Sequence, residues 1–434
     1  MERVIGVVGF ATMIGIAWLL STDRRRINWR LVGMGVTLQV AFGLIVLKTG
    51  VGRGFLRGVN NAFLQLLTFT EQGARFIFGN LVRNNVPVGP AEGAVPDMAP
   101  LMQVEMWAHT GAYFAFSILP IIIFFSALTS ILYYLGILQR VVKGIAWIMH
   151  RTMRTSGAET LSVAANIFVG LTEAPLLVKP YVKGMTISEL NTLMVGGFAT
   201  IAGSVLAAYI GMLSPFFPDV GGHLITASVM NAPAALLLAK ILVPETREPE
   251  TAGDLTVASD RHGANLIDAA ASGAAQGLQL ALNVGAMLLA FVALLAMANF
   301  GVTWIGGLAG IEGLSIERVL GWVLTPLAWL MGAPWAEAGT VGSLIGIKIV
   351  LTEFVGYLQL AGELGAGTLS ERSELIATYA LLGFANLPTI AVIIGGVGGL
   401  APERRSDLAR LGLKAMIGGN LAAFMSASLA GILT

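Results

Sequence analysis

Long apolar runs with almost no charge alternate with shorter polar segments along this chain. Each run approaches or exceeds the ~20 residues that an α-helix needs to cross the hydrocarbon core of a bilayer. The pattern therefore predicts membrane-spanning helices over residues 4–20, 31–47, 111–138, 223–243, 275–300 and 407–432.

Four segments between these runs predict structure outside the hydrocarbon core. Residues 54–82 mix apolar side chains with charged and amide side chains, which is typical of an amphipathic helix in the membrane interface. Residues 84–110 hold four prolines and predict an extramembrane loop. Residues 244–262 form the most polar stretch and predict a cytoplasmic linker, which leads through a short surface helix at 263–274 into the next span.

The composition supports a membrane-embedded protein. Of the 434 residues, 56% are hydrophobic and only 12% are charged. These are too few charged residues to cover the surfaces of several soluble domains. The 26 Lys and Arg nearly cancel the 25 Asp and Glu, which argues against a nucleic-acid partner. The chain has no cysteine, so disulfides, Cys-zinc sites and thiol nucleophiles are excluded, and its four scattered histidines do not favour a metal site.

Two regions repeat the same motifs in the same order. Residues 171–173 (LTE) recur at 351–353, and residues 197–200 (GFAT) recur as GFAN at 383–386. Weaker matches around them pair residues 140–141, 146–147 and 186–189 with residues 318–319, 328–329 and 368–371. Five ordered matches indicate an internal duplication.

Each repeat predicts the same two elements. An apolar segment reaches a polar Thr-Glu tip and a second apolar segment returns, which predicts a re-entrant helical hairpin. A helix interrupted at mid-length follows, at 200–204 in the first repeat and at 386–389 in the second. The expected fold is an all-α polytopic membrane protein with inverted repeats, two re-entrant helical hairpins and two discontinuous helices, the pattern of secondary transporters.

The expected domain division follows these elements. It comprises scaffold spans with the interfacial helix (1–138), transport repeat 1 (139–243), a cytoplasmic linker with a surface helix (244–274), a scaffold span (275–300) and transport repeat 2 (315–434).

The second repeat is expected to be inverted, because three crossings separate the two hairpins. Positive charge agrees: Lys and Arg cluster at the base of the first hairpin and at 404–414, which places both in the cytoplasm. The segments 213–222 and 301–314 lack Lys and Arg and are expected outside. The arginines of helix 54–82 disagree, because they fall on the predicted outer side.

Glu173 and Glu353 are the strongest candidates for a function at the bilayer centre. A carboxylate there costs about 2.5–3.5 kcal/mol, so a duplicated carboxylate suggests a use, such as accepting hydrogen bonds from a polar solute or binding a cation. The alternative is that both cap neighbouring helix N-termini. Lys348, in an apolar run, is expected to pair with a carboxylate inside the bundle.

The broken helices add oxygen ligands that suit a hard cation. Their free backbone groups lie beside the hydroxyls of Thr200, Ser204 and Thr389. Asn386 can both donate and accept, which suits sugar hydroxyls. Helix–helix hydrogen bonding is the alternative for each of these side chains.

At these motifs the chain resembles the concentrative nucleoside transporter family. Residues 170–175 (GLTEAP) are similar to the family's first hairpin signature, GQTEAP. Residues 346–357 (GIKIVLTEFVGY) are similar to GxKxxxNEFVxY, and residues 383–386 match GFAN. The resemblance covers essentially the whole chain.

The resemblance implies roles for individual residues. The first hairpin tip and its broken helix would meet the nucleobase, and the second hairpin and its broken helix would hold the ribose. The implied substrate-binding residues are Leu171, Thr172, Glu173 and Val205 on the base side and Thr352, Glu353, Phe384, Asn386 and Thr389 on the ribose side. The implied Na⁺ ligands are Asn166, Thr200 and the backbone carbonyls of Val169 and Ile201.

Three positions depart from the family pattern. Leu171 stands where the family has Gln, Thr352 stands where it has Asn, and Thr389 stands where Ser is usual. A missing hydrogen-bond partner shifts selectivity, because a buried substrate group is then left unpaired. These departures therefore weaken the prediction of the substrate more than they weaken the prediction of transport.

The expectation is a sodium-coupled nucleoside symporter of a cell inner membrane, not an enzyme, with no cofactor other than Na⁺ as the coupling ion. The family resemblance implies a homotrimer and an elevator-type movement. The alternatives are a proton-coupled carrier of nucleosides or nucleoside-like solutes with the same fold, and a membrane receptor that does not transport.

Overall fold

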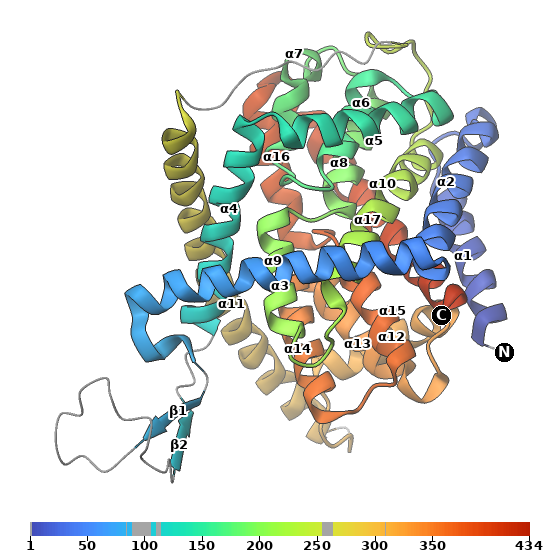
Figure 1. Ribbon diagram of the computed structural model, residues 1–434. Coiled ribbons are helices and arrows are strands. Elements are labelled where there is room, and N and C mark those ends of the chain that lie inside the picture. Colours follow the sequence, from blue (N-terminus) through green and yellow to red (C-terminus); the bar gives the residue numbers. More distant parts are fainter. Residues whose placement is uncertain (1, 84, 89–105, 110–113, 254–263, 309) are drawn as a thin grey trace.

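The computed structural model describes residues 2–83, 85–88, 106–109, 114–253, 264–308 and 310–434, and it shows a helical bundle with one short strand pair (Figure 1). The elements in chain order are α1 (Glu2–Leu19), η1 (Arg24–Arg26), α2 (Trp29–Lys48), α3 (Gly50–Phe78), η2 (Gly79–Val82), β1 (Asn85–Val88), β2 (Met106–His109), η3 (Phe114–Ile118), α4 (Leu119–Tyr134), α5 (Ile137–Met153), α6 (Gly157–Ala165), η4 (Ala174–Val178), α7 (Lys179–Val182), α8 (Ile187–Ala199), α9 (Gly203–Leu213), α10 (Val220–Leu242), α11 (Leu266–Leu308), α12 (Ile316–Leu330), α13 (Trp335–Val350), α14 (Glu353–Ala366), α15 (Glu371–Leu381), α16 (Leu387–Leu400), η5 (Pro402–Arg404) and α17 (Arg405–Leu433).

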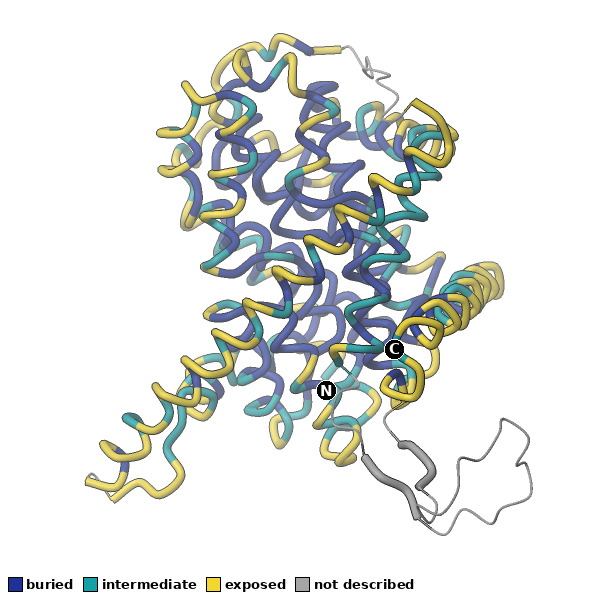
Figure 2. Tube along the Cα trace, turned by 90° about the vertical axis from the view of Figure 1, so that its left-hand side faces the viewer, coloured by how far each residue is buried: buried dark blue, intermediate teal, exposed yellow. Residues whose placement is uncertain are grey.

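Central and outer helices differ sharply in burial. In the most apolar stretches of α8–α9, α10 and α17, 89% of the residues are buried, against 17% in α11 and 22% in α1. Figure 2 shows the same division, with buried residues in the middle of the bundle and exposed residues along its outer faces. By length and apolar composition, seven helices of the described residues can cross a membrane, or eight if the bent pair α12–α13 counts as one span.

The outer helices pack in two separate groups. Helices α1 and α2 lie against α17 and α10, whereas α4 lies against α11 and α9. Helix α3 crosses the front of the bundle, almost at right angles to the long axis of the bundle (Figure 1). It contacts α10 and α2. The division into scaffold and transport segments remains a prediction, and these contacts join α1 and α2 to helices of the two repeats.

The two hairpins lie at opposite ends of the molecule, as an inverted pair would (Figure 1). In the first, α6 leads to a tip at 166–173, and η4 and α7 lead back. In the second, α13 ends at Val350 and α14 begins at Glu353, so the turn between them is only two residues long. Helices α12 and α13 meet at a bend of 117°.

Both discontinuous helices are present, but the second break is not where the sequence pattern placed it. The first break separates α8 from α9 at residues 200–202, as expected. The second lies at residues 382–386, whereas the expectation was 386–389. Pro388 lies in the first turn of α16, where a missing N–H costs nothing, so it starts a helix rather than interrupting one.

Helix α11 corrects two further expectations. No separate surface helix exists at 264–274, because α11 is continuous from Leu266 and its early residues are alanine-rich, which favours helix. The same helix continues to Leu308, so most of the expected outer loop at 301–314 is helical. With 43 residues, it is far longer than the ~20 residues that a span requires.

Parts of two other predicted segments lie outside the described residues. In the predicted loop 84–110, β1 and β2 pair antiparallel, with Asn85 opposite His109, and residues 84, 89–105 and 110 are not described. The same holds for residues 111–113 of the predicted span 111–138 and for residues 254–263 of the predicted linker and surface helix.

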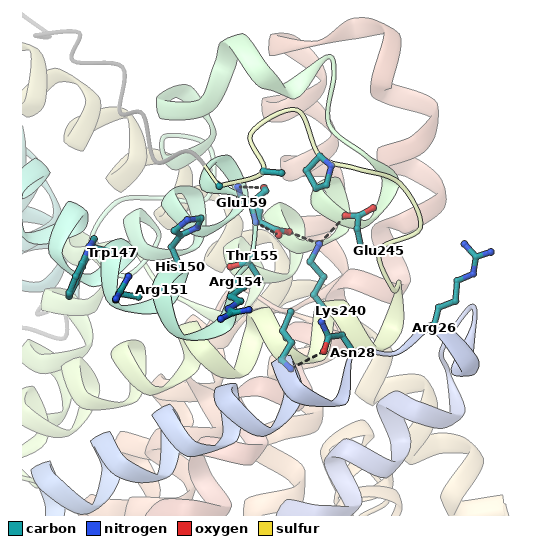
Figure 3. Close-up of a pocket in the computed structure, with 15 residues that line it drawn as sticks. Arg26, Asn28, Trp147, His150, Arg151, Arg154, Thr155, Glu159, Lys240 and Glu245 are labelled. Atoms are coloured by element: carbon teal, nitrogen blue, oxygen red, sulfur yellow. Dashed lines mark hydrogen bonds and ion pairs between the residues drawn. The ribbon is translucent and has the colours of Figure 1, made fainter.

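A buried ion cluster fastens the base of the first hairpin (Figure 3). The Lys240 Nζ of α10 lies 2.8 Å from Glu159 Oε2 of α6 and 3.1 Å from Glu245 Oε2. Ser156 caps α6 and its hydroxyl donates to Glu189 Oε1 of α8 at 2.5 Å. The cluster lines a cavity of about 870 Å³ and ties α6, α8 and α10 together.

We expect Lys240→Met to destabilise the protein, because it leaves the buried Glu159 carboxylate without its cation. Removing one partner of a buried ion pair costs about 3–5 kcal/mol. The measurement is the melting temperature of the purified protein in detergent. Lys183→Met is the matched control, since its ion pair with Glu403 is exposed and 3.5 Å long. Equal melting temperatures for the two variants would contradict the role given to the cluster.

Candidate functional site

Glu353 lies at the centre of a buried hydrogen-bond network. It is the first residue of α14, and only 4% of its surface is exposed. Tyr209 of α9 donates its hydroxyl to Glu353 Oε1 at 3.0 Å, and the Asn386 Nδ2 donates to Oε2 at 2.7 Å. The carboxylate therefore joins the second hairpin to both broken helices.

Two aromatic rings pack against the tyrosine that donates to this carboxylate. The rings of Tyr209 and Tyr357 stack with centroids 4.3 Å apart, and Phe354 meets Tyr209 edge-on at 5.0 Å. Tyr357 donates its hydroxyl to the Thr378 carbonyl at 2.8 Å. These contacts restrict the Tyr209 ring, so its hydroxyl stays aimed at Glu353.

Asn386 is held by the helix that it begins. Its Oδ1 accepts from the backbone N–H of Thr389 at 2.9 Å and from the Thr389 hydroxyl at 2.7 Å, as an N-cap does. The amide group is thereby oriented with its Nδ2 toward Glu353. The expected residues Glu353, Asn386 and Thr389 thus lie in one network, and Phe384 lies half-buried in the same break.

Glu173 occupies a different environment from Glu353. It is exposed, and its Oε2 accepts a hydrogen bond from the Gly170 N–H of its own tip at 2.9 Å. This bond lies within the tip and caps no helix N-terminus, so it is not the capping considered as the alternative for both glutamates. Glu173 also faces a crevice of about 310 Å³ between the hairpin and helices α4 and α11, whose lining includes Tyr133, Leu176 and Gln276.

The remaining residues of the first tip pack into the bundle. Leu171 is buried and lies against Gly197 of α8, and Thr172 lies against Gly396 of α16. Val205 of α9 is buried as well. Thr352 of the other repeat accepts from the Val355 N–H at 3.4 Å and caps α14, so its hydroxyl is engaged with the backbone.

The first tip and the first break are joined directly. The Gly203 N–H donates to the Phe168 carbonyl at 2.9 Å, and the Ser228 hydroxyl of α10 donates to the Ile167 carbonyl at 3.2 Å. This contact brings the tip segment that contains Asn166 and Val169 next to the break that contains Thr200 and Ile201.

Asn166 is unusual among the residues of this junction. It is 1% exposed, and among the described residues neither its Oδ1 nor its Nδ2 has a hydrogen-bond partner. Thr200 donates its hydroxyl to the Gly196 carbonyl at 2.8 Å, which leaves the oxygen lone pairs available. A buried amide without a partner costs free energy, and binding of a cation or a polar ligand would give it one.

Among the described residues, Lys348 does not form the ion pair with a carboxylate that was expected. Its Nζ donates to the backbone carbonyls of Ala380 at 2.9 Å and Leu382 at 3.1 Å. These carbonyls have no helical N–H partner because α15 ends there. The lysine therefore supplies the hydrogen bonds that the carbonyls at the second break would otherwise lack. Lys348 therefore supports the site without belonging to it.

Tyr209 is the site residue that the sequence analysis missed. A tyrosine within an apolar helix has no distinctive pattern. Its position ten residues beyond the GFA motif of the first repeat was the only signal.

Comparisons with known proteins agree along the chain. Family profiles described as "Na+ dependent nucleoside transporter", N-terminus and C-terminus, match residues 8–81 and 223–431, and a "Nucleoside recognition" profile matches residues 115–216. The chain is 43% identical to the nucleoside permease NupC of Helicobacter pylori, over 99% of this chain and 98% of that protein.

Two further proteins extend the comparison. The chain is 40% identical to sodium/nucleoside cotransporter 1 of Rattus norvegicus, over 100% of this chain and 64% of that protein. The solved structure of CNTnw in an inward-facing substrate-bound state is similar with a TM-score of 0.88 and 44% identity, over 100% of this chain and 98% of that one.

Proposed function

Because the chain belongs to the concentrative nucleoside transporter family, we propose that it is a sodium-coupled symporter that imports nucleosides across an inner membrane. Its family and its many apolar helices make it a multi-pass membrane transporter of nucleosides rather than an enzyme. The observation that carries the proposal is the buried Glu353, held by Tyr209 and Asn386 where both broken helices meet the second hairpin.

The ribose binds at Glu353 in this proposal. A carboxylate accepts hydrogen bonds from sugar hydroxyls, and the second N–H of the Asn386 amide can donate to one. Phe384 and Thr389 complete this side, with Thr352 at the hairpin turn. The three side chains of Tyr209, Glu353 and Asn386 are already oriented, so little conformational entropy is lost when the sugar binds.

The nucleobase binds at the first hairpin tip in this proposal. Thr172, Glu173, Val205 and Leu171 form this side. Glu173 accepts from the base after releasing the Gly170 N–H, and its exposure to the 310 Å³ crevice gives a solute access to it.

Sodium binds between the first tip and the first break in this proposal. The ligands are Asn166 Oδ1, the Thr200 hydroxyl and the carbonyls of Val169 and Ile201. These are oxygen ligands, which a hard cation prefers. The unpartnered amide of Asn166 supports the assignment, because a bound ion would satisfy its oxygen.

Coupling follows from this arrangement. Sodium orders the tip that carries Leu171, Thr172 and Glu173, so each ligand favours the conformation that the other needs. An elevator-type movement, which the family resemblance implies, is part of the proposal. A homotrimer, as the resemblance implies, is part of the proposal.

The first prediction of the proposed function concerns sodium. Uridine or adenosine is expected to bind at least about fivefold more tightly in Na⁺ than in choline, the lower end of typical coupling between two sites. Equilibrium binding to the purified protein measures this, and Asn166→Leu should remove the difference. Binding that ignores sodium, together with uptake driven by a pH gradient, would select the proton-coupled alternative. Ligand binding without counterflow in liposomes would select the receptor.

The second prediction concerns the ribose. Glu353→Gln is expected to abolish ribonucleoside uptake with expression intact, because the amide loses the charge and one acceptor. Tyr209→Phe keeps the ring stack and removes one hydrogen bond to a charged group, worth about 1.5–3 kcal/mol, so it should raise the half-saturating concentration about tenfold or more. Uptake by proteoliposomes measures both, and unchanged uptake in Glu353→Gln would remove this residue from the site.

The third prediction concerns the base. Leu171→Gln restores the amide of the family signature and is expected to improve binding of some nucleosides over others, because hydrogen bonds discriminate between bases more strongly than an apolar contact does. Competition by a panel of nucleosides against one radiolabelled nucleoside measures this. An unchanged rank order would show that residue 171 does not face the base.

A further inference from the structure

The two helix breaks are adjacent in the structure and form a single junction. Gly383 has φ of +108°, and a Cβ there would come within 2.6 Å of the Phe198 carbonyl oxygen and 2.9 Å of the Ala199 carbonyl oxygen. Gly419 of α17 lies just as close to Phe198. The backbones of the two breaks therefore touch where no side chain fits between them.

At each break, a backbone carbonyl accepts a hydrogen bond from an asparagine of the spanning helix that follows. Asn231 of α10 donates its Nδ2 to the Ala199 carbonyl at 2.7 Å, and Asn420 of α17 donates its Nδ2 to the Ala385 carbonyl at 2.9 Å. Ala199 and Ala385 occupy the same position of the GFA motif in the two repeats. The two bonds span 32 and 35 residues, so the duplication includes the asparagines.

The residue after each bonded carbonyl is a proposed ligand. Thr200 and Asn386 both have extended backbone, with φ of −118° and −135°. Thr200 belongs to the proposed sodium site, and Asn386 donates to Glu353. A hydrogen bond to the preceding carbonyl fixes the peptide plane from which each ligand projects.

Helix α10 also holds the other wall of the first site. Ser228 lies three residues before Asn231, on the same helix face, and donates to the Ile167 carbonyl of the tip at 3.2 Å. The tip and the break that flank the proposed sodium ion are thus both fastened to α10. The buried Oδ1 atoms of Asn231 and Asn420 have no hydrogen-bond partner among the described residues.

We propose that Asn231 and Asn420 are paired positioning residues, one for the cation and the other for the solute. Asn231, with Ser228, holds the first tip and break in the geometry that binds the cation, and Asn420 holds Asn386 in the geometry that binds the nucleoside. This inference rests on the proposed function.

The test is equilibrium nucleoside binding to purified Asn231→Leu and Asn420→Leu, with sodium and nucleoside titrated separately at saturating levels of the other. Losing a hydrogen bond worth up to about 1.5 kcal/mol shifts a half-saturating concentration by up to about tenfold. We expect Asn231→Leu and Ser228→Ala to raise the value for sodium and leave that for nucleoside near wild type. Asn420→Leu should raise the value for nucleoside and leave that for sodium near wild type.

Asn191→Leu is the matched control. Asn191 is also buried, also donates to a backbone carbonyl, that of Ala239 at 3.1 Å, and also has an unpartnered Oδ1, but it lies near the opposite end of α8 from the break. It should lower the melting temperature without changing either half-saturating concentration. If Asn231→Leu and Asn420→Leu behave like Asn191→Leu, their role is only structural and the proposal is wrong.

The same measurements separate this inference from the proposed function. A wild-type protein that binds nucleoside without regard to sodium contradicts sodium coupling, and the role of Asn231 fails with it. The role of Asn420 is still decided by nucleoside affinity alone. If sodium coupling holds and the two variants shift the wrong ligand or both ligands alike, the proposed function stands and the inference fails.

Discussion

A peptide carbonyl that faces the apolar interior of a membrane protein has no water to donate a hydrogen bond to it, and every helix break in such a place must find a partner within the protein. Three side chains meet this requirement here. Asn231 donates a hydrogen bond to the Ala199 carbonyl, and Asn420 donates one to the Ala385 carbonyl. Lys348 donates to the carbonyls of both Ala380 and Leu382. These donors lower the free-energy cost of the breaks, and the breaks present functional groups that continuous helices would not.

The duplicated glutamates show how one motif serves two environments. Glu353 is buried between donors from both repeats, whereas Glu173 is exposed and bonded to its own tip. The difference follows from the hairpins: α14 begins directly at Glu353, while Glu173 precedes a short 3₁₀ segment that leaves its side chain toward the crevice. A nucleoside is equally asymmetric, with a hydroxyl-rich sugar at one end and a planar base at the other.

The sequence predicted the elements better than their contacts. Apolar runs located the spans, and the repeated motifs located both hairpins and the first break, because hydrophobic length and duplication are visible in one dimension. Pro388 misplaced the second break, since a proline that ends one helix and a proline that begins another look alike in sequence. Tyr209 could not be identified, because its partner Glu353 is 144 residues away and only folding brings them together. Lys348 was expected to pair with a carboxylate because it lies in an apolar run. The carbonyls that it bonds to instead belong to a break that the sequence pattern placed elsewhere.

The departures from the family pattern fall unevenly on the proposed site. On the sugar side, Thr352 and Thr389 keep hydroxyls that cap α14 or bond to Asn386, so the network around Glu353 is complete with the residues present. On the base side, Leu171 offers no hydrogen bond and lies against Gly197 instead. A base with polar edges would leave groups unpaired against that leucine, whereas the sugar would not. In the proposed transporter the ribose therefore provides the recognition shared by all substrates, and the base side, where Leu171 departs from the family pattern, provides the discrimination between them.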